Sequence, residues 1–209
     1  MSECGRAGED APGADGAARG WPRLDFLRSA LAGAAAVAGA VLFGGADTVR
    51  GADSQERDVR VLNLVLLLEY TQAAFYAEAI QNAGLAGDLL DYAQAVARHE
   101  QEHVAFLRQA LGRDAVASPR FDFGRATRDP DAFTRAAIEL EDLAVAGYNG
   151  QATNLSRATL AAAARIVSVE ARHAGWIRAL AARVAAPEPV EKPVTAAALE
   201  QGLRQIGMR

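Results

Sequence analysis

Hydrophobic residues recur every three or four positions through most of the chain after residue 53, which is the period of an amphipathic helix. Glycines, prolines and capping residues interrupt this pattern and divide it into four long helices and one short helix. We predict helices at about 54–82, 88–112, 129–151, 156–186 and 195–206. The third begins at Asp129-Pro130, a capping residue followed by proline in the first turn.

The connections between these helices predict how they are arranged. The first and second helices, and the third and fourth, are joined by short connections, whereas residues 113–128 form a long crossover. This connectivity is typical of ferritin-like bundles. The 49 alanines agree with it, because alanine is the best helix former. We therefore predict an all-α protein with a ferritin-like four-helix bundle at 47–186, then a proline-rich linker and a short C-terminal helix at 187–209.

Residues 1–46 form a separate segment. The first 20 residues are rich in Gly, Ala and Asp without a hydrophobic period, which predicts disorder. An uncharged run at 29–46 follows Arg28 and ends in small residues, which favours an export signal. The stretch 23–28 (RLDFLR) resembles a twin-arginine signal in which Leu24 replaces the second arginine. The alternatives are a buried alanine-rich helix or an uncleaved membrane anchor through 29–46. The export reading predicts a protein of the periplasm, the cell envelope or the extracellular space.

Charge and composition exclude several functional classes. The net charge is −4 and both signs are dispersed, so no basic stripe for nucleic acid is expected. The single cysteine, Cys4, excludes an internal disulfide framework and a cysteine-rich metal site. Chemistry that depends on histidine must use His99, His103 or His173, because the chain has 3 histidines.

Two blocks of sequence recur at nearly the same offset. Leu68-Glu69 followed by Tyr76 returns 72 residues later as Leu140-Glu141 followed by Tyr148. Glu100-x-x-His103 with Phe106 and Arg108 returns 70 residues later as Glu170-x-x-His173 with Trp176 and Arg178. The two helical hairpins therefore look like copies of one unit.

The repeated carboxylates lie on faces that must be buried. Glu69 ends an apolar run and shares a helical stripe with Leu66 and Tyr76, so it points into the core, whereas Glu78 faces the opposite, solvated side. Glu100 and His103 are three residues apart and can reach the same ion. At ~1.5 Å rise per residue, both carboxylates of the first hairpin lie at a similar height above its turn. The second hairpin repeats the arrangement.

Four buried carboxylates and two neutral imidazoles would carry a charge that two divalent cations balance. One Glu from each of two helices and Glu-x-x-His from the other two is the ligand pattern of di-iron and di-manganese bundles. Oxygen and nitrogen ligands without thiolate suit iron or manganese. The predicted metal ligands are Glu69, Glu100, His103, Glu141, Glu170 and His173.

These motifs resemble those of bacterial ferritin-like domain proteins, a group similar to plant desiccation-related proteins. The resemblance covers about residues 54–206 and includes the phrases LEY at 68–70, ARHEQEHV at 97–104, FDF at 121–123, YNG at 148–150 and VEARH at 169–173. It implies a metal-binding four-helix fold, often preceded by an export signal.

Residues near the predicted ligands have two interpretations each. Tyr76 and Tyr148 could pack in the core or hydrogen-bond a ligand. His99 lies one turn before His103 and is expected at the rim of the site or in contact with a ligand. Phe106 and Trp176 are expected to fill the core.

Two functional classes follow from the sequence. The first is an exported dinuclear iron or manganese oxidoreductase that acts on O2, peroxide or Fe(II), as a ferroxidase, peroxidase or catalase-like enzyme. The second is a non-catalytic stress or envelope protein in which a metal is structural or vestigial. Iron storage is a third class, which would need a hollow shell. A homo-oligomer is compatible with each class.

Overall fold

The computed structural model of this chain describes residues 45–209, and its side chains from residue 53. The described part is all-α, as predicted. Its long elements are α2 (Gly45–Asn82), α3 (Gly87–Leu111), α4 (Pro130–Gln151), α5 (Arg157–Leu180) and α6 (Ala196–Ile206). Short 3-10 turns lie between them: η2 (Gly112–Asp114), η3 (Gly124–Thr127) and η4 (Ala152–Asn154).

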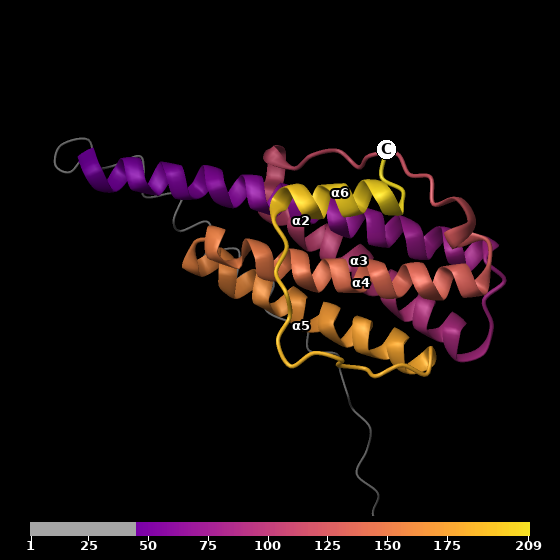
Figure 1. Cartoon of the computed structure of the whole chain (residues 1–209). Coiled ribbons are helices and arrows are strands. Elements are labelled where there is room, and N and C mark those ends of the chain that lie inside the picture. The colour runs from indigo at the N-terminus through magenta and orange to yellow at the C-terminus, as the bar shows by residue number, and fades with distance from the viewer. Residues whose placement is uncertain (1–44) are drawn as a thin grey trace, which may run out of the picture.

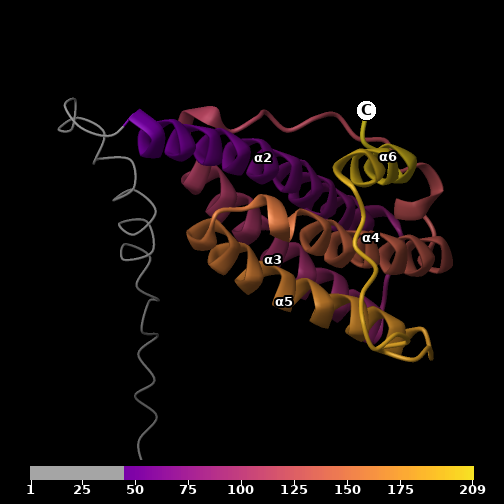
Figure 2. The same ribbon diagram turned by 60° about the vertical axis from the view of Figure 1, so that its left-hand side comes forward.

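The four long helices form the predicted bundle of two hairpins. Helix α2 packs mainly on α3, and α4 packs mainly on α5 (Figures 1 and 2). The crossover between α3 and α4 runs along the outside of the bundle, and α6 lies over α2 and α4. The connectivity therefore confirms the ferritin-like topology, in which a long connection separates two tightly turned hairpins.

Local capping signals explain where most helices begin. The Asp129 side chain accepts a hydrogen bond from the Ala132 backbone N–H, and Pro130 occupies the first turn of α4. The Ser156 hydroxyl caps α5 in the same way. The carboxylate of Asp58 on α2 holds this cap, because it accepts hydrogen bonds from the Ser156 N–H at 2.8 Å and from the Ser156 and Thr159 hydroxyls at 2.5 Å. The second hairpin is thereby fixed to the first helix.

Two helix boundaries differ from the prediction. Helix α2 begins at Gly45 rather than near residue 54, and its first turns extend past the rest of the bundle (Figure 1). Helix α5 ends at Leu180 rather than at the prolines that begin at residue 187. The chain turns there through Ala182, whose φ of 54° is left-handed, and the Arg183 N–H closes the helix end on the Arg178 carbonyl at 2.8 Å.

The C-terminal segment crosses the bundle and holds the crossover in place. Leu199 and Leu203 of α6 are fully buried. The segment between α5 and α6, residues 181–195, is called the strap here. Where it passes over α4, the Val194 N–H donates to the Ala146 carbonyl at 3.1 Å. Beyond α6, Met208 forms an isolated antiparallel bridge with Phe121 of the crossover.

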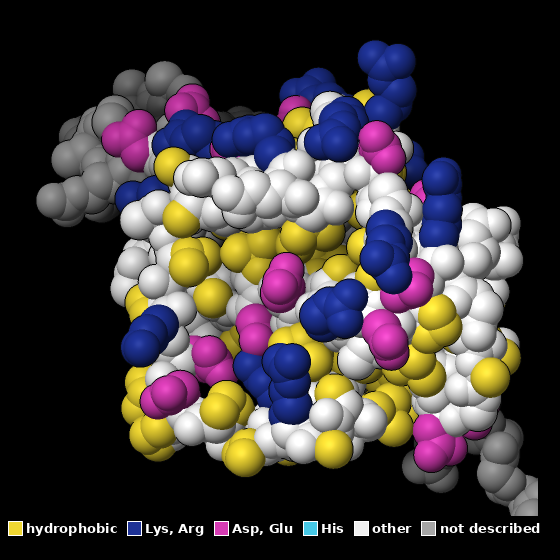
Figure 3. Space-filling model, turned by 45° about the vertical axis from the view of Figure 1, so that its right-hand side comes forward, with side chains coloured by type: hydrophobic (Ala, Val, Ile, Leu, Met, Phe, Trp, Pro, Cys, Tyr) yellow, Lys and Arg dark blue, Asp and Glu magenta, His cyan; other side chains and the backbone are white. Residues whose placement is uncertain are grey.

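The surface and the N-terminal segment bear on the remaining expectations. On the face drawn in Figure 3, basic and acidic side chains are interspersed with apolar ones. Among the described residues, no helix has the length and apolarity to cross a membrane. The predicted disordered and export segment, residues 1–46, lies outside the described residues except for its last two positions, which belong to α2.

Candidate metal centre

Four glutamates meet in the middle of the bundle, one from each long helix. Glu69 lies on α2, Glu100 on α3, Glu141 on α4 and Glu170 on α5, and all four are 0% exposed. Ionised carboxylates without a positive partner would be costly at such depth. The structure places the four predicted carboxylates at one level of the bundle, as their heights above the hairpin turns predicted.

The first group of potential ligands surrounds the imidazole of His103. Its Nδ1 atom lies 3.2 Å from Oε2 of Glu69, 3.0 Å from Oε2 of Glu100 and 3.1 Å from Oε1 of Glu170. These residues come from three helices, α2, α3 and α5. Their ligand atoms lie within 4.8 Å of one another, so one ion could contact all of them.

The second group surrounds the imidazole of His173. Its Nδ1 atom lies 3.1 Å from Oε1 of Glu100, 3.5 Å from Oε2 of Glu141 and 3.9 Å from Oε2 of Glu170. This group also satisfies the 4.8 Å limit. The structure thus brings together all six residues that were predicted as ligands, although the binding of metal by them stays a prediction.

Glu100 and Glu170 belong to both groups. Each directs one carboxylate oxygen toward His103 and the other toward His173. Glu69 and Glu141 each belong to one group. Two carboxylates are therefore shared by the two groups, and each group has one further carboxylate and one imidazole of its own, an arrangement that could hold a pair of ions.

Unpaired polar atoms show that these residues fit cations. Within the described part of the chain, Oε1 of Glu100, Oε2 of Glu141, Oε1 of Glu170 and Nδ1 of His173 are buried without a hydrogen-bond partner. Several of them lie close together, but their geometry is not that of a hydrogen bond. Buried polar atoms are rarely left unpaired in native proteins. Convergent oxygen and nitrogen lone pairs of this kind suit iron or manganese.

Both tyrosines of the repeat donate a hydrogen bond to a predicted ligand on the other hairpin. The Tyr76 hydroxyl on α2 donates to Oε1 of Glu141 on α4 at 2.5 Å. The Tyr148 hydroxyl on α4 donates to Oε1 of Glu69 on α2, also at 2.5 Å. Both tyrosines are buried. They leave the other oxygen of each terminal carboxylate to face its imidazole.

Sequence reasoning missed two buried residues of this centre. The amide of Gln72 donates to Oε2 of Glu170 at 2.9 Å and to Oε1 of Glu141 at 3.3 Å. The hydroxyl of Tyr92 lies 2.9 Å from the hydroxyl of Tyr76. At the repeat offsets their counterparts are Ala144 and Ala162, so the repeat gave no signal for either residue. For Gln72, a polar residue three positions after Glu69 on the same helix face was the available signal.

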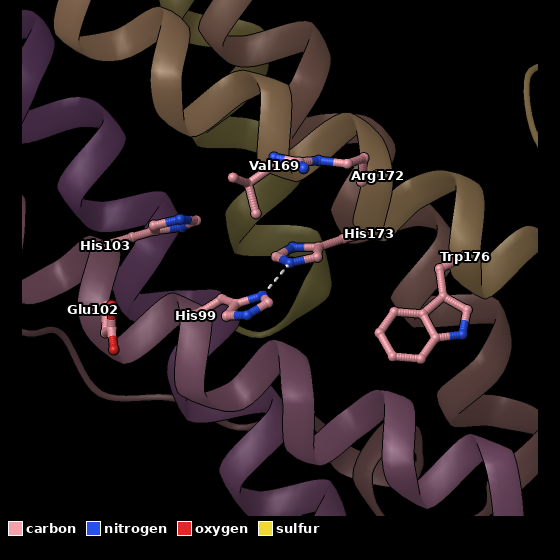
Figure 4. Close-up of a pocket in the computed structure, with 7 residues that line it drawn as sticks. All are labelled: His99, Glu102, His103, Val169, Arg172, His173 and Trp176. Carbon is pink, nitrogen blue, oxygen red and sulfur yellow. Dashed lines mark hydrogen bonds between the residues drawn. The ribbon is translucent and has the colours of Figure 1, made fainter. Parts of the chain in front are cut away.

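A pocket of about 400 Å³ opens the centre toward solvent between α3 and α5 (Figure 4). The rings of His99 and His173 stack in it, and Nδ1 of His99 lies 2.9 Å from Nε2 of His173. His99 therefore lies at the rim and also touches a predicted ligand. The residues around the pocket are His99, Glu102, His103, Val169, Arg172, His173 and Trp176.

Two expectations for side chains around the site were wrong. Trp176 does not fill the core but is 41% exposed at the pocket, because α5 turns this face toward solvent at the pocket. Glu78 is half-buried rather than fully solvated, because η3 packs against α2 and Thr127 donates a hydrogen bond to it at 2.6 Å. Phe106 is partly buried against the core.

Without metal, protons would balance the charge of the centre. Burial raises the pKa of Glu69 well above its usual value of 4.5 and raises the pKa of Glu141 to about 8. Burial acts against ionisation of His173 as well, but the carboxylates of Glu100 and Glu141 outweigh it and raise the pKa of His173 to about 12. The same balance raises the pKa of His103. Despite burial, the two imidazoles lower the pKa of Glu170 to about 2.

Comparison with known proteins matches this chain to one family. The model of the ferritin-like domain matches residues 57–183, which is more than half of the chain. The matched segment contains all six predicted ligands, the whole of α3, α4 and α5, and α2 from residue 57 onward. A search of curated proteins returned no match.

Proposed function

Because this chain belongs to the ferritin-like domain family, we propose that it is an exported oxidoreductase that holds two iron or manganese ions and acts on O2, peroxide or Fe(II). One observation carries the proposal: Glu100 and Glu170 each face both imidazoles and so join two four-ligand groups. A single structural ion would need only one such group.

The residues of each group have distinct roles in this proposal. Glu69 and His103 would hold one ion, Glu141 and His173 the other, and Glu100 and Glu170 would bridge them. Two such ions with open coordination positions would bind O2 or peroxide and exchange electrons with it. Four carboxylates and two divalent ions are neutral together, so the charge of the core is balanced.

The surrounding side chains hold the ligands in place. Tyr76 and Tyr148 fix one oxygen of each terminal carboxylate, and Gln72 fixes Glu141 and Glu170. If Nδ1 of His173 binds an ion, Nε2 of the same ring must carry the proton. That Nε2–H group then donates a hydrogen bond to Nδ1 of His99. His99 would therefore select the tautomer of His173 that can bind metal.

The pocket supports reaction with small molecules. The pocket reaches the ring edges of His103 and His173, the two predicted histidine ligands. Glu102, Arg172 and Trp176 line its mouth (Figure 4). A volume of about 400 Å³ leaves room for O2, peroxide or a hydrated Fe(II) ion. The proposed export rests on the sequence pattern of residues 23–46.

Metal analysis of the protein purified from native cells, with a visible spectrum, tests the proposal. We expect two ions of iron or manganese per chain, and oxidation of Fe(II) or turnover of peroxide by the loaded protein. The same purification from Glu141→Ala and His173→Ala cells should yield fewer ions, and two retained ions would show that the ligands are assigned wrongly.

Other results of these measurements would favour the other classes. Two bound ions without Fe(II) oxidation or peroxide turnover would favour a structural metal in a non-catalytic envelope protein. A large hollow particle in light scattering would favour iron storage. Cell fractionation tests export, and a protein found only in the cytoplasm would contradict it.

A further inference from the structure

A series of aromatic side chains connects the candidate metal centre with the protein surface. The Tyr76 hydroxyl donates a hydrogen bond to Glu141, and the side chains of Tyr76 and Tyr92 are both 0% exposed. Trp176 stands at the outer end of the series and is 41% exposed. It lies at the pocket on α5, one turn beyond His173 (Figure 4).

Every step of this series is a direct contact. The ring centroids of Tyr76 and Tyr92 lie 5.9 Å apart, with an angle of 74° between the planes. The ring centroids of Tyr92 and Trp176 lie 5.2 Å apart, with an angle of 87°. Both are edge-to-face pairs, a favourable geometry for aromatic rings. Electron tunnelling slows steeply with distance, so rings in contact are far better relays than one long step through aliphatic side chains.

Among the described residues, the series occurs on one side of the centre. Tyr148 contacts Glu69 as Tyr76 contacts Glu141, but the repeat places Ala162 where the second tyrosine would stand. Alanine has no side chain that can be oxidised, so it cannot serve as an electron relay. Of the two tyrosine–carboxylate contacts, the one through Tyr76 therefore continues through Tyr92 toward an exposed indole.

Hydrogen bonds along the series also provide for the protons that phenol oxidation releases. The hydroxyl proton of Tyr76 is directed to Glu141, so Tyr92 must be the donor in the 2.9 Å contact between the two hydroxyls. A phenol that loses an electron also gives up its hydroxyl proton, and here each proton has an acceptor within hydrogen-bond distance.

We propose that Tyr76, Tyr92 and Trp176 carry single electrons from a soluble one-electron donor at the surface to the buried metal centre. The inference rests on the proposed redox function. The final oxidant is O2 or peroxide, and the reductant is an external one-electron donor that contacts the exposed indole of Trp176.

The electrons and protons of this transfer balance. Tyr76 loses an electron to the oxidised centre and its proton to Glu141. Tyr92 then gives an electron and a proton to Tyr76. Trp176 gives an electron to Tyr92, while the proton on Glu141 returns through Tyr76 to Tyr92. The donor finally reduces the Trp176 cation radical, so one electron has crossed and no proton has been gained or lost.

Photochemical oxidation of the metal-free, full-length protein at pH 9 tests the series without any metal chemistry, because Glu141, whose pKa is raised to about 8, can then accept a proton. A Trp21→Phe background leaves Trp176 as the single tryptophan, because the chain has 2. Light-generated tris(bipyridine)ruthenium(III) would oxidise the exposed indole, whereas all four tyrosines are 8% exposed or less. We expect the absorption of the tryptophan radical to decay as that of a tyrosyl radical appears.

Variants assign the transfer to this series. Tyr92→Phe should keep the tryptophan radical but lose the tyrosyl signal, and Trp176→Phe should lose both. Tyr70→Phe is the control and should behave like the reference protein, because the Tyr70 hydroxyl donates to the Val116 carbonyl and touches no predicted ligand. Trp176 is exposed, so its variant provides the test even if Tyr92→Phe does not fold. A tyrosyl signal that survives in Tyr92→Phe or Trp176→Phe, or that never forms in the reference, would overturn the proposal.

The metal-loaded protein separates this proposal from the proposed function. With hexacyanoferrate(II) as donor, we expect Trp176→Phe to lose peroxide-dependent oxidation of the donor. Turnover at the wild-type rate in that variant would overturn the series and leave the redox centre intact. Tyrosyl formation in the metal-free protein together with no turnover of the loaded wild type would overturn the redox function instead.

Discussion

The hydroxyl of Tyr148 on α4 donates a hydrogen bond of 2.5 Å to Oε1 of Glu69 on α2. Tyr76 makes the reciprocal contact from α2 to Glu141 on α4. The two tyrosines thus join the hairpins across the candidate centre, and each orients a carboxylate that its own helix does not carry. This exchange makes the ligand geometry of one hairpin depend on the packing of the other.

Removal of the Tyr148 hydroxyl should weaken the binding of a metal ion at the His103 end of the centre. In Tyr148→Phe, Glu69 keeps its position on α2 but loses the donor that fixes its Oε1 atom. Loss of such a partner typically lowers metal affinity about 10–100-fold. Calorimetric titration with Mn(II) would measure the change.

Tyr70→Phe is the control for this prediction, because the Tyr70 hydroxyl donates to the Val116 carbonyl at 3.3 Å and does not touch a predicted ligand. Its Mn(II) affinity should equal that of the wild type. Equal losses in both variants would mean that the tyrosine acts through general stability.

Bridging and terminal carboxylates should differ in how many ions they retain. Glu69→Ala removes a residue of one group and should leave one ion per chain. Glu100→Ala removes a residue of both groups and should leave neither ion tightly bound. The metal-to-protein ratio after gel filtration distinguishes the two results, and circular dichroism would show that both variants remain helical. A single ion retained by both variants would contradict the shared bridge.

Removal of metal should reverse the response of stability to pH. In the metal-free fold the pKa of Glu141 is raised from 4.5 to about 8, and that of His173 from 6.5 to about 12. The folded state then binds protons more tightly than the unfolded state, so stability falls as pH rises between about 5 and 8. The lowered pKa of Glu170 acts only at more acidic pH, because its two values are about 2 and 4.5.

In the loaded protein the ions replace those protons, so metal binding releases protons and tightens as pH rises. Thermal melts at pH 5 and pH 8, with and without a chelator, measure both responses. We expect the melting temperature to fall with pH in chelator and to rise with pH in the presence of metal. A chelator-treated protein that is more stable at pH 8 than at pH 5 would contradict the predicted protonation.

Gly150 should be more sensitive to substitution than a glycine elsewhere in the bundle. A Cβ atom at Gly150 would lie 1.8 Å from the carbonyl oxygen of Val194, so Gly150→Ala must displace the strap that crosses α4. We expect a loss of about 1–3 kcal/mol, the usual cost of overpacking. Thermal or urea unfolding would measure it.

Gly175→Ala is the matched control, because its Cβ atom would approach no closer than 3.7 Å to Ala185 and α5 would gain a better helix former. It should leave stability unchanged or raise it by up to ~1 kcal/mol. Equal destabilisation by both alanines would show that the contact with the strap is unimportant.

Local signals explain which parts of the fold could be predicted. Helix α4 has the predicted bounds because Asp129, Pro130 and the apolar period all act within a few residues. The end of α5 was not predictable in this way, because its left-handed position is Ala182 rather than the glycine that usually marks such a turn. The start of α2 at Gly45 was not predicted either, because the sequence has no distinctive capping residue there.

The candidate site divides in the same way. The repeat identified the six predicted ligands, because each has a counterpart of the same type in the other hairpin. Gln72 and Tyr92 have alanine counterparts and were missed for that reason. The exchange of tyrosines between hairpins depends on how α2 and α4 face each other, which no pattern along one helix reveals.

The position of the two imidazoles has a consequence for metal exchange. His103 and His173 line the pocket, whereas the four carboxylates lie behind them at 0% exposure. An ion that enters or leaves through this opening must pass the imidazole edge, and a chelator must displace nitrogen before it reaches oxygen. If the centre holds ions as proposed, the two imidazoles would therefore set the rate at which the ions exchange.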